Sequence, residues 1–150
     1  MISKKAKYAL KALQYLAQKC SKEPVLISEI AGKEKIPQKF LEAILLELKN
    51  KGILQSKKGK RGGYFLARPS AQIKISDLLR ALEGPLAPLP CLSRTTAHAT
   101  CEDCIDENTC GIKKVMQEAY AAQIGHLENT TLRDLVDFCD QVNIAPTYQI

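Results

Sequence analysis

The stretch Pro37-Gln-Lys-Phe-Leu-Glu-Ala-Ile-Leu-Leu-Glu-Leu-Lys-Asn-Lys-Gly-Ile-Leu-Gln-Ser-Lys-Lys-Gly-Lys-Arg-Gly-Gly-Tyr-Phe-Leu66 decides the fold of this chain. Its first half carries large apolar residues at helical spacing, namely Phe40, Leu41, Ile44, Leu45 and Leu48. Gly52 ends that pattern, and two strand-like runs, residues 53–55 and 64–66, flank a glycine-bearing tip. The stretch predicts a helix with Pro37 in its first turn, followed by a basic β-hairpin.

Two more helices are predicted before this stretch. Residues 4–19 repeat apolar side chains at helical spacing, with Ser3 as the N-cap. Ser28 is expected to cap a short helix over residues 29–32 or slightly beyond. The order of helix, short helix, helix and basic hairpin is typical of a winged helix-turn-helix. Its wing touches DNA beside the groove that the second helix of the helix-turn-helix pair enters, which here is the helix after Pro37. A phosphate loop is the weaker interpretation, because the tip lacks the GxxxxGK[ST] spacing.

The second half of the chain predicts three helices and a cysteine-rich loop. Residues 75–84 favour a short helix with Ser76 as its cap. A long helix over residues 112–127 is apolar around too much of its surface for one small core, which predicts a second subunit as its partner. Thr131 is expected to cap a last helix over residues 132–139.

Charge divides the chain into two unlike halves. Up to Arg68, 16 Lys and Arg stand against 5 Asp and Glu, whereas the remainder has 6 against 11. A basic first half joined to an acidic second half favours a polyanion-binding module attached to a regulatory or assembly module, although charge alone fits a solvated basic face equally well. No apolar run approaches the roughly 20 residues of a membrane span, and Lys11 interrupts the early apolar segment. We therefore expect a cytoplasmic protein with no membrane partner.

Four of the six cysteines, Cys91, Cys101, Cys104 and Cys110, fall within twenty residues. Thiolates crowd together either to form disulfides or to surround a soft metal or an iron-sulfur cluster, and a reducing cytoplasm favours the metal. Four thiolates suit [2Fe-2S] and [4Fe-4S] clusters and also zinc. A zinc ribbon usually has two close Cys pairs, and only one is present, so zinc is the less favoured metal. His98 in the same loop could replace one thiolate, but a solvent-facing loop histidine is the favoured interpretation.

Four segments make the chain recognisable: Lys7-Tyr8-Ala9-Leu10, Ile36-Pro-Gln-Lys-Phe-Leu-Glu42, Leu48-Lys-Asn-Lys-Gly-Ile-Leu54 and Gly62-Gly63-Tyr64. With them the chain resembles, over nearly its whole length, the Rrf-two family of IscR-, NsrR- and CymR-like bacterial winged-helix regulators. The resemblance implies a homodimer that binds a pseudo-palindromic operator in double-stranded DNA, with the long helix at the dimer interface. Many members hold an iron-sulfur cluster that sets DNA affinity, whereas CymR-like members lack one and work through a partner protein.

The cysteine loop departs from the family's pattern. IscR-like members carry C-x5-C-x5-C with a histidine three residues past the last cysteine. Here Cys104 and Cys110 fit the second half and Cys91 the first place, but Lys113 occupies the histidine position. The carboxylate that NsrR-like members take from the first helix is replaced by Lys7. The fourth cysteine of the loop can supply the ligand that is missing, so we expect a site of four thiolates.

The expected DNA contacts begin on the helix that follows Pro37. Gln38 suits an adenine edge, Lys39 suits guanine or a phosphate, and Glu42 suits cytosine N4. The other expected contacts are the wing cations Lys58, Lys60 and Arg61 and, from the resemblance, Lys5 and Tyr8. Tyr8 could equally belong to the core.

We therefore expect a mainly α fold with a small β-hairpin wing. Residues 1–84 form the DNA-binding domain, 85–111 the cluster-binding loop, and 112–150 the dimerisation and C-terminal helices. The expected function is a transcriptional regulator that senses iron-sulfur status, redox state or nitric oxide through its cluster. One alternative is a cluster-free, CymR-like repressor controlled by thiol oxidation or a partner protein.

The alternative from another class is a thiol redox enzyme that uses Cys101 and Cys104. It is disfavoured because the sequence offers no βαβ surroundings for a redox Cys-x2-Cys, and we expect no enzyme. The last two cysteines, Cys20 and Cys139, are expected to be buried small hydrophobes. His126 is expected to have no role beyond packing or the surface.

Overall fold

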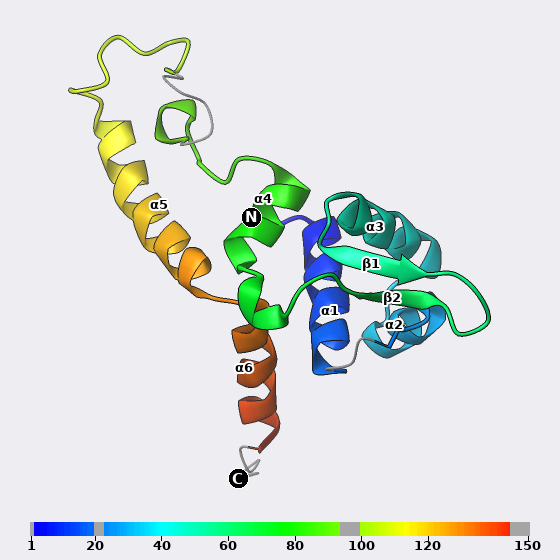
Figure 1. Cartoon of the computed structure of the whole chain (residues 1–150). Helices are drawn as coiled ribbons and strands as arrows, with labels where there is room; N and C mark the ends of the chain where they lie inside the picture. The colour runs from blue at the N-terminus through cyan, green and yellow to red at the C-terminus, as the bar shows by residue number, and fades with distance from the viewer. Residues whose placement is uncertain (1, 20–22, 94–99, 145–150) are drawn as a thin grey trace.

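The computed structural model describes residues 2–19, 23–93 and 100–144, the side chains of 142–144 aside. Within these residues it is mainly α-helical with one antiparallel hairpin, which confirms the predicted fold class (Figure 1). The elements are α1 Lys4–Gln18, α2 Ile27–Glu34, α3 Gln38–Asn50, β1 Leu54–Lys57, β2 Gly63–Leu66, the 3-10 turn η1 Ser70–Gln72, α4 Ile75–Glu83, the 3-10 turn η2 Pro90–Leu92, α5 Gly111–Asn129 and α6 Leu132–Ile144.

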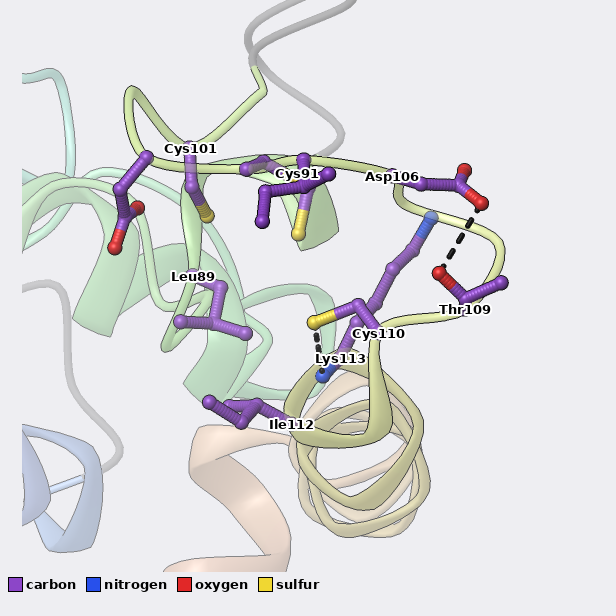
Figure 2. Close-up of a pocket in the computed structure, with 11 residues that line it drawn as sticks. Leu89, Cys91, Cys101, Asp106, Thr109, Cys110, Ile112 and Lys113 are labelled. Carbon is purple, nitrogen blue, oxygen red and sulfur yellow. Dashed lines mark hydrogen bonds between the residues drawn. The ribbon is translucent and has the colours of Figure 1, made fainter.

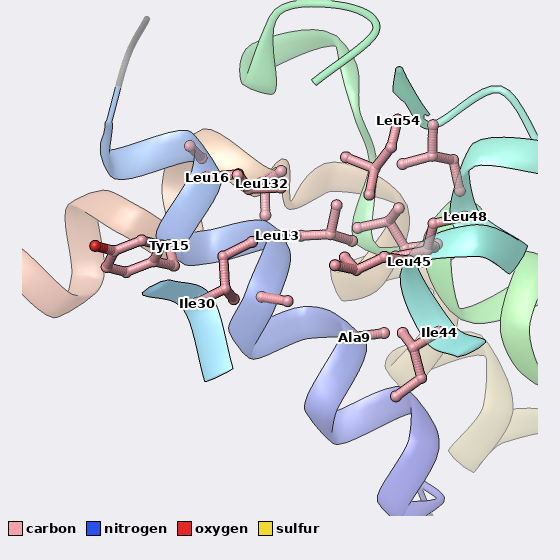
Figure 3. Packing of buried hydrophobic residues seen from close by; sticks show 14 of the residues in the cluster. Ala9, Leu13, Tyr15, Leu16, Ile30, Ile44, Leu45, Leu48, Leu54 and Leu132 are labelled. Atoms are coloured by element: carbon pink, nitrogen blue, oxygen red, sulfur yellow. The ribbon is translucent and has the colours of Figure 1, made fainter. Parts of the chain in front are cut away.

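One apolar core joins the first three helices to the wing and to α6. Figure 3 shows side chains of α1, α2, α3, β1 and α6 converging, among them Leu13, Ile30, Leu45 and Leu132. These side chains are fully buried, and burying one of this size stabilises the fold by about 1.5–3 kcal/mol. The core therefore fixes α3 and the hairpin relative to α1.

The structure corrects the start of α2. Ser3 caps α1 as predicted, because its Oγ accepts a hydrogen bond from the backbone N–H of Ala6 at 3.1 Å. The prediction that Ser28 caps α2 is wrong, since the helix begins at Ile27, two residues before the predicted start, and its N-cap residue Leu26 offers no side-chain oxygen. Pro37 is the N-cap residue of α3 instead of part of its first turn, a difference of one residue.

Phe40 does not join the buried stripe of α3, contrary to the sequence prediction. Its side chain is 43% exposed, and its ring meets the ring of Tyr8 edge-on, with 5.8 Å between centroids. The core side of α3 is already filled by the other four apolar residues of the predicted stripe. Since successive helical residues are about 100° apart, Phe40 falls at the margin of that stripe and covers Tyr8.

Ser76 does not cap α4, so that prediction is also wrong. The helix begins at Ile75, because Lys74 pairs with Thr131 in an isolated β-bridge and is held extended. Ser76 is fully buried, and its hydroxyl has no hydrogen-bond partner within the described part of the chain. Thr131 does cap α6, as predicted, with Oγ1 accepting from the Asp134 N–H at 3.2 Å.

The long helix α5 extends away from the winged-helix body and carries the cysteine loop at its far end (Figure 1). It packs against α4, and Arg80 of α4 pairs with Glu128 of α5 at 2.6 Å. Along its first turns Ile112 and Val115 are 68% and 67% exposed, so this apolar surface is uncovered in the single chain. No helix in the described ranges is long and apolar enough to cross a membrane.

Candidate DNA interface and cysteine cavity

The opening turns of α3 present the polar residues that the sequence predicted. Gln38, Lys39 and Glu42 are all exposed. The Gln38 amide donates a hydrogen bond to Glu42 Oε1 at 3.3 Å, one turn along the helix. This hydrogen bond holds the two side chains together on the exposed surface of α3.

The wing lies beside these residues. Strands β1 and β2 pair from Leu54 opposite Leu66 to Lys57 opposite Gly63, and their exposed tip carries the predicted wing cations Lys58, Lys60 and Arg61. A cavity of about 400 Å³ separates the wing from the starts of α2 and α3, and Gln38 and Lys57 both line it. Helix α3 and the wing thus form one polar, cationic surface.

Lys5 and Tyr8 both contact α3 from α1. Lys5 Nζ lies 3.2 Å from Glu47 Oε2, so this lysine already has an acidic partner. Tyr8 is half-buried, packs edge-on against Phe40, and has Lys4 Nζ 5.8 Å from its ring centroid. Tyr8 therefore packs on the core margin and also reaches the surface, and its contact with DNA stays a prediction.

All four clustered cysteines line one cavity of about 410 Å³ between the loop and the start of α5 (Figure 2). Each is half-buried and none forms a disulfide. The apolar side chains of Leu89, Ile105 and Ile112 complete much of the wall. Cys91 comes from η2 and Cys110 is the N-cap residue of α5, so the structure gathers thiols from both ends of the loop.

Local hydrogen bonds shape the loop around the cavity. The N–H of Cys104 donates to the carbonyl of Cys101 at 3.0 Å and closes a turn. Asp106 accepts from the backbone of Asn108 and the hydroxyl of Thr109, which lowers the pKa of that carboxyl. Cys110 Sγ accepts from the Lys113 N–H at 3.4 Å. The turn and the carboxylate thus order both sides of the cavity.

The surroundings of Cys91 and Cys104 favour the protonated form of these two thiols. Partial burial raises the pKa of Cys91, and a hydrogen bond with Cys101 raises it further. Burial also raises the pKa of Cys104, with the neighbouring Cys110 and Cys101 as the next causes. Lys113 lines the same cavity, and Glu107 raises the pKa of its ammonium group. Binding a metal here would therefore release protons.

Sharing one cavity does not make these thiols a finished metal site. Within residues 2–19, 23–93 and 100–144, no group of three or more His, Cys, Asp or Glu side chains is arranged to hold a metal ion.

His98 and Cys20 lie outside the described residues. Cys139 is half-buried instead of fully buried, and its sulfur accepts from Gln14 Nε2 at 2.9 Å. His126 is exposed on α5.

Sequence reasoning missed Lys113 as part of the cavity wall. The residue was noted only because it replaces a histidine ligand of related proteins. Its spacing from Cys110 was the available signal, because residues three apart on a helix share a face. Sequence reasoning also missed Leu46 as an exposed apolar residue on α3.

The fold and these two surfaces define a winged helix-turn-helix regulator with a cysteine-lined cavity. The model of the Rrf2 family, described as iron-dependent transcriptional regulators, matches residues 2–138. The chain belongs to the Rrf2 family of helix-turn-helix transcriptional regulators. An rrf2-like HTH-type transcriptional regulator of Rhodobacter capsulatus is 43% identical over 139 residues, which cover 91% of this chain and 92% of the relative.

Two solved structures are also similar to this chain. CymR of B. subtilis, described as the global cysteine regulator, has a TM-score of 0.76 and 29% identity, over 92% of this chain and 97% of CymR. IscR of T. potens has a TM-score of 0.75 and 26% identity, over 99% of this chain and 94% of IscR. The relatives are regulators and not enzymes, so the thiol redox enzyme considered from the sequence is set aside.

Proposed function

We propose that this protein is a homodimeric, DNA-binding transcriptional regulator whose operator affinity is set by an iron-sulfur cluster held by Cys91, Cys101, Cys104 and Cys110. The observation that carries this proposal is that all four thiols line one cavity. Four thiolates are the ligand set of both [2Fe-2S] and [4Fe-4S] clusters. Such a cluster, when bound, supplies an iron centre that responds to redox state, nitric oxide or iron supply.

The cavity residues fit a cluster in type and location. Leu89, Ile105 and Ile112 give the cavity apolar walls. The backbone N–H of Lys113 already points at Cys110 Sγ, and hydrogen bonds to ligand sulfurs tune such sites. Because the four sulfur atoms are not arranged as a ligand group in this structure, binding a cluster requires the loop to move inward so that the sulfurs approach one another.

A continuous set of contacts connects the loop to the DNA-binding helices. The loop is anchored between the end of α4 and the start of α5. Glu83, the last residue of α4, accepts a hydrogen bond from the hydroxyl of Ser3, which also caps α1. Helix α1 packs on α3 through the core and through the Lys5–Glu47 ion pair. Inward movement of the loop would therefore shift α4, and through α4 it would shift α1 and α3.

On the DNA side, we assign α3 to the major groove. Gln38, Lys39 and Glu42 would read base edges, since amide, ammonium and carboxylate groups match adenine, guanine and cytosine edges respectively. The exposed wing tip supports backbone contacts through its three cations. Lys5 would reach a phosphate by exchanging Glu47 for it, and Tyr8 would add a hydroxyl contact beside Lys5.

A cluster-free regulator is the second candidate. The shared cavity supports it, because Cys91 and Cys101 both line it and an oxidant could join two such thiols into a disulfide after the loop moves. The similarity to CymR over 92% of this chain supports it as well. A zinc site of the same four thiolates is a third, less favoured occupant of the cavity.

Anaerobic purification with metal analysis distinguishes these candidates. We expect a coloured protein with visible charge-transfer absorption and matching amounts of iron and acid-labile sulfide. Cys101→Ser should lose the colour, whereas Cys139→Ser should keep it, because Cys139 lies on α6 and does not line the cavity. Colourless wild-type protein, free of iron after reconstitution, would overturn the cluster proposal. Zinc in that protein would identify the zinc site instead.

The same sample then tests regulation. DNA binding is measured by fluorescence anisotropy on an operator selected from random duplexes, before and after the cluster is removed by chelation. A change in affinity upon cluster loss supports the proposed control. Equal affinity with and without the cluster contradicts it, and a change that depends only on disulfide formation favours the cluster-free candidate.

A further inference from the structure

Leu46 is a large apolar residue on the outward side of α3, where its side chain is 51% exposed. The core side of the helix is occupied by Leu45 and its buried neighbours, through which α3 packs on α1, α2 and β1. Leu46 shares the opposite side with Lys39, Ala43 and Asn50, which follow at spacings of four, three and four residues and are all exposed. It therefore stands on the face that would enter a DNA groove.

Leu46 is not the only apolar residue of this surface. Ala43, one turn earlier on the same side, is also exposed. A single exposed leucine needs no explanation in a folded protein. An apolar strip formed by Ala43 and Leu46 on the outward side of α3 is different, because the surrounding half of the chain is strongly basic. That charge favours a polyanion as the occupant of this face over another apolar protein surface.

Double-stranded DNA offers one apolar feature that matches such a strip. In the major groove only thymine presents a methyl group, and proteins read it through apolar contact. We propose that Leu46, together with Ala43, reads the C5-methyl of thymine in the operator. This inference rests on the proposed placement of α3 in the major groove. It adds a specificity-determining residue to the polar readers at the start of the helix.

The position of Leu46 predicts which base pair it reads. It lies seven residues beyond Lys39, which is about 10 Å along a helix at 1.5 Å per residue. At 3.4 Å per base pair this corresponds to about three base pairs. Burying one methyl group against leucine strengthens binding by about fourfold per half-site, the equivalent of about 0.8 kcal/mol.

The test replaces single thymines of the selected operator with deoxyuridine, which removes only the methyl group. Wild-type protein, Leu46→Ala and Phe138→Ala are compared by fluorescence anisotropy on each duplex. Phe138 is a matched control because it is also 51% exposed but lies on α6. At the position that Leu46 reads, a second pair of duplexes carries cytosine or 5-methylcytosine, so the methyl contact is separated from the base itself.

We expect one thymine per half-site whose loss of methyl weakens wild-type binding by about fourfold. Leu46→Ala should bind both duplexes equally, while Phe138→Ala keeps the wild-type preference. The inference is overturned if Leu46→Ala retains the preference, if no thymine shows one, or if the substitution alters the oligomeric state instead. Failure of this inference differs from failure of the proposed function. If α3 does not read DNA at all, Lys39→Ala and Glu42→Ala will also leave the sequence preference unchanged. If only the inference about Leu46 fails, these two variants will still change it.

Discussion

Lys113 and Glu107 form an ion pair at the wall of the cysteine cavity, with 2.7 Å between Nζ and Oε2. Lys113 is the only cation among the described residues that line this cavity, alongside the carboxylates of Asp103 and Asp106. A lysine ammonium is not a ligand for iron while it is protonated. We therefore expect Lys113 to act on the cavity through its charge.

Lys113→Gln should lower the reduction potential of a cluster bound in the cavity. Reduction adds negative charge, and removing a nearby cation makes that addition less favourable. The shift should be on the order of several tens of millivolts, because solvent screens a charge at a half-open site. A spectroscopically monitored redox titration measures it.

Lys114→Gln is the matched control for that titration. It removes the same charge from the adjacent residue, which is exposed and does not line the cavity. Equal shifts in the two variants would show that only the net charge of the protein matters. A potential that rises in Lys113→Gln would contradict the assigned role.

Gly63→Ala should weaken the attachment of the wing. Gly63 has φ of +151°, and a Cβ there would overlap the carbonyl oxygen of Val25, whose backbone pairs with Tyr64. The loss of stability should be about 1–3 kcal/mol, measured by chemical denaturation. Gly59→Ala is the control, because its φ is +110° but a Cβ there meets open space. If both variants lose the same stability, backbone strain alone is responsible.

The fold was largely predictable because its signals are local. Helical spacing, the break at Gly52 and the glycine-bearing tip each specify an element without knowledge of the rest of the chain. The error at Ser76 has a tertiary cause. A backbone bridge from Lys74 to Thr131 fixes where α4 starts, and a propensity for serine at caps carries no information about such a bridge.

The site was predictable in its residue types but not in its contacts. Four cysteines in one loop indicate a shared site whatever the fold. The engagement of Lys5 with Glu47 was not foreseeable, because the two residues are on different helices and meet only after packing. The exposure of Phe40 also depends on which side of α3 the core occupies, and helical spacing alone assigned Phe40 to the buried stripe.

Lys60→Ala and Arg61→Ala should each reduce the salt dependence of DNA binding. A cation that neutralises one phosphate contributes a slope of about −0.9 to the plot of log affinity against log salt. Both residues are exposed at the wing tip, and the loss applies in every subunit that contacts DNA. Anisotropy titrations at several salt concentrations measure the slope. Lys114→Ala, which removes a charge from α5, should leave the slope unchanged, and a wing variant with an unaltered slope would argue against backbone contact by the wing.

Asp134→Asn should destabilise the protein at neutral pH and do so less as the pH falls. Asp134 accepts hydrogen bonds from the hydroxyl and the backbone N–H of Thr131, both at 2.7 Å, and these lower the pKa of its carboxyl. A lowered pKa means that the folded state favours the carboxylate. The stabilising contribution is therefore complete above the ordinary pKa of about 4 and is lost as the pH falls through the lower value of the folded state.

Urea denaturation of both proteins at pH 7, 4 and 2.5 follows that loss. The difference in unfolding free energy should be largest at pH 7 and smallest at pH 2.5. Asp140→Asn removes the same charge from the exposed side of α6, outside the cap, and should show no such trend. A difference that stays constant with pH would mean that Asp134 stabilises α6 through the geometry of its hydrogen bonds and not through its charge.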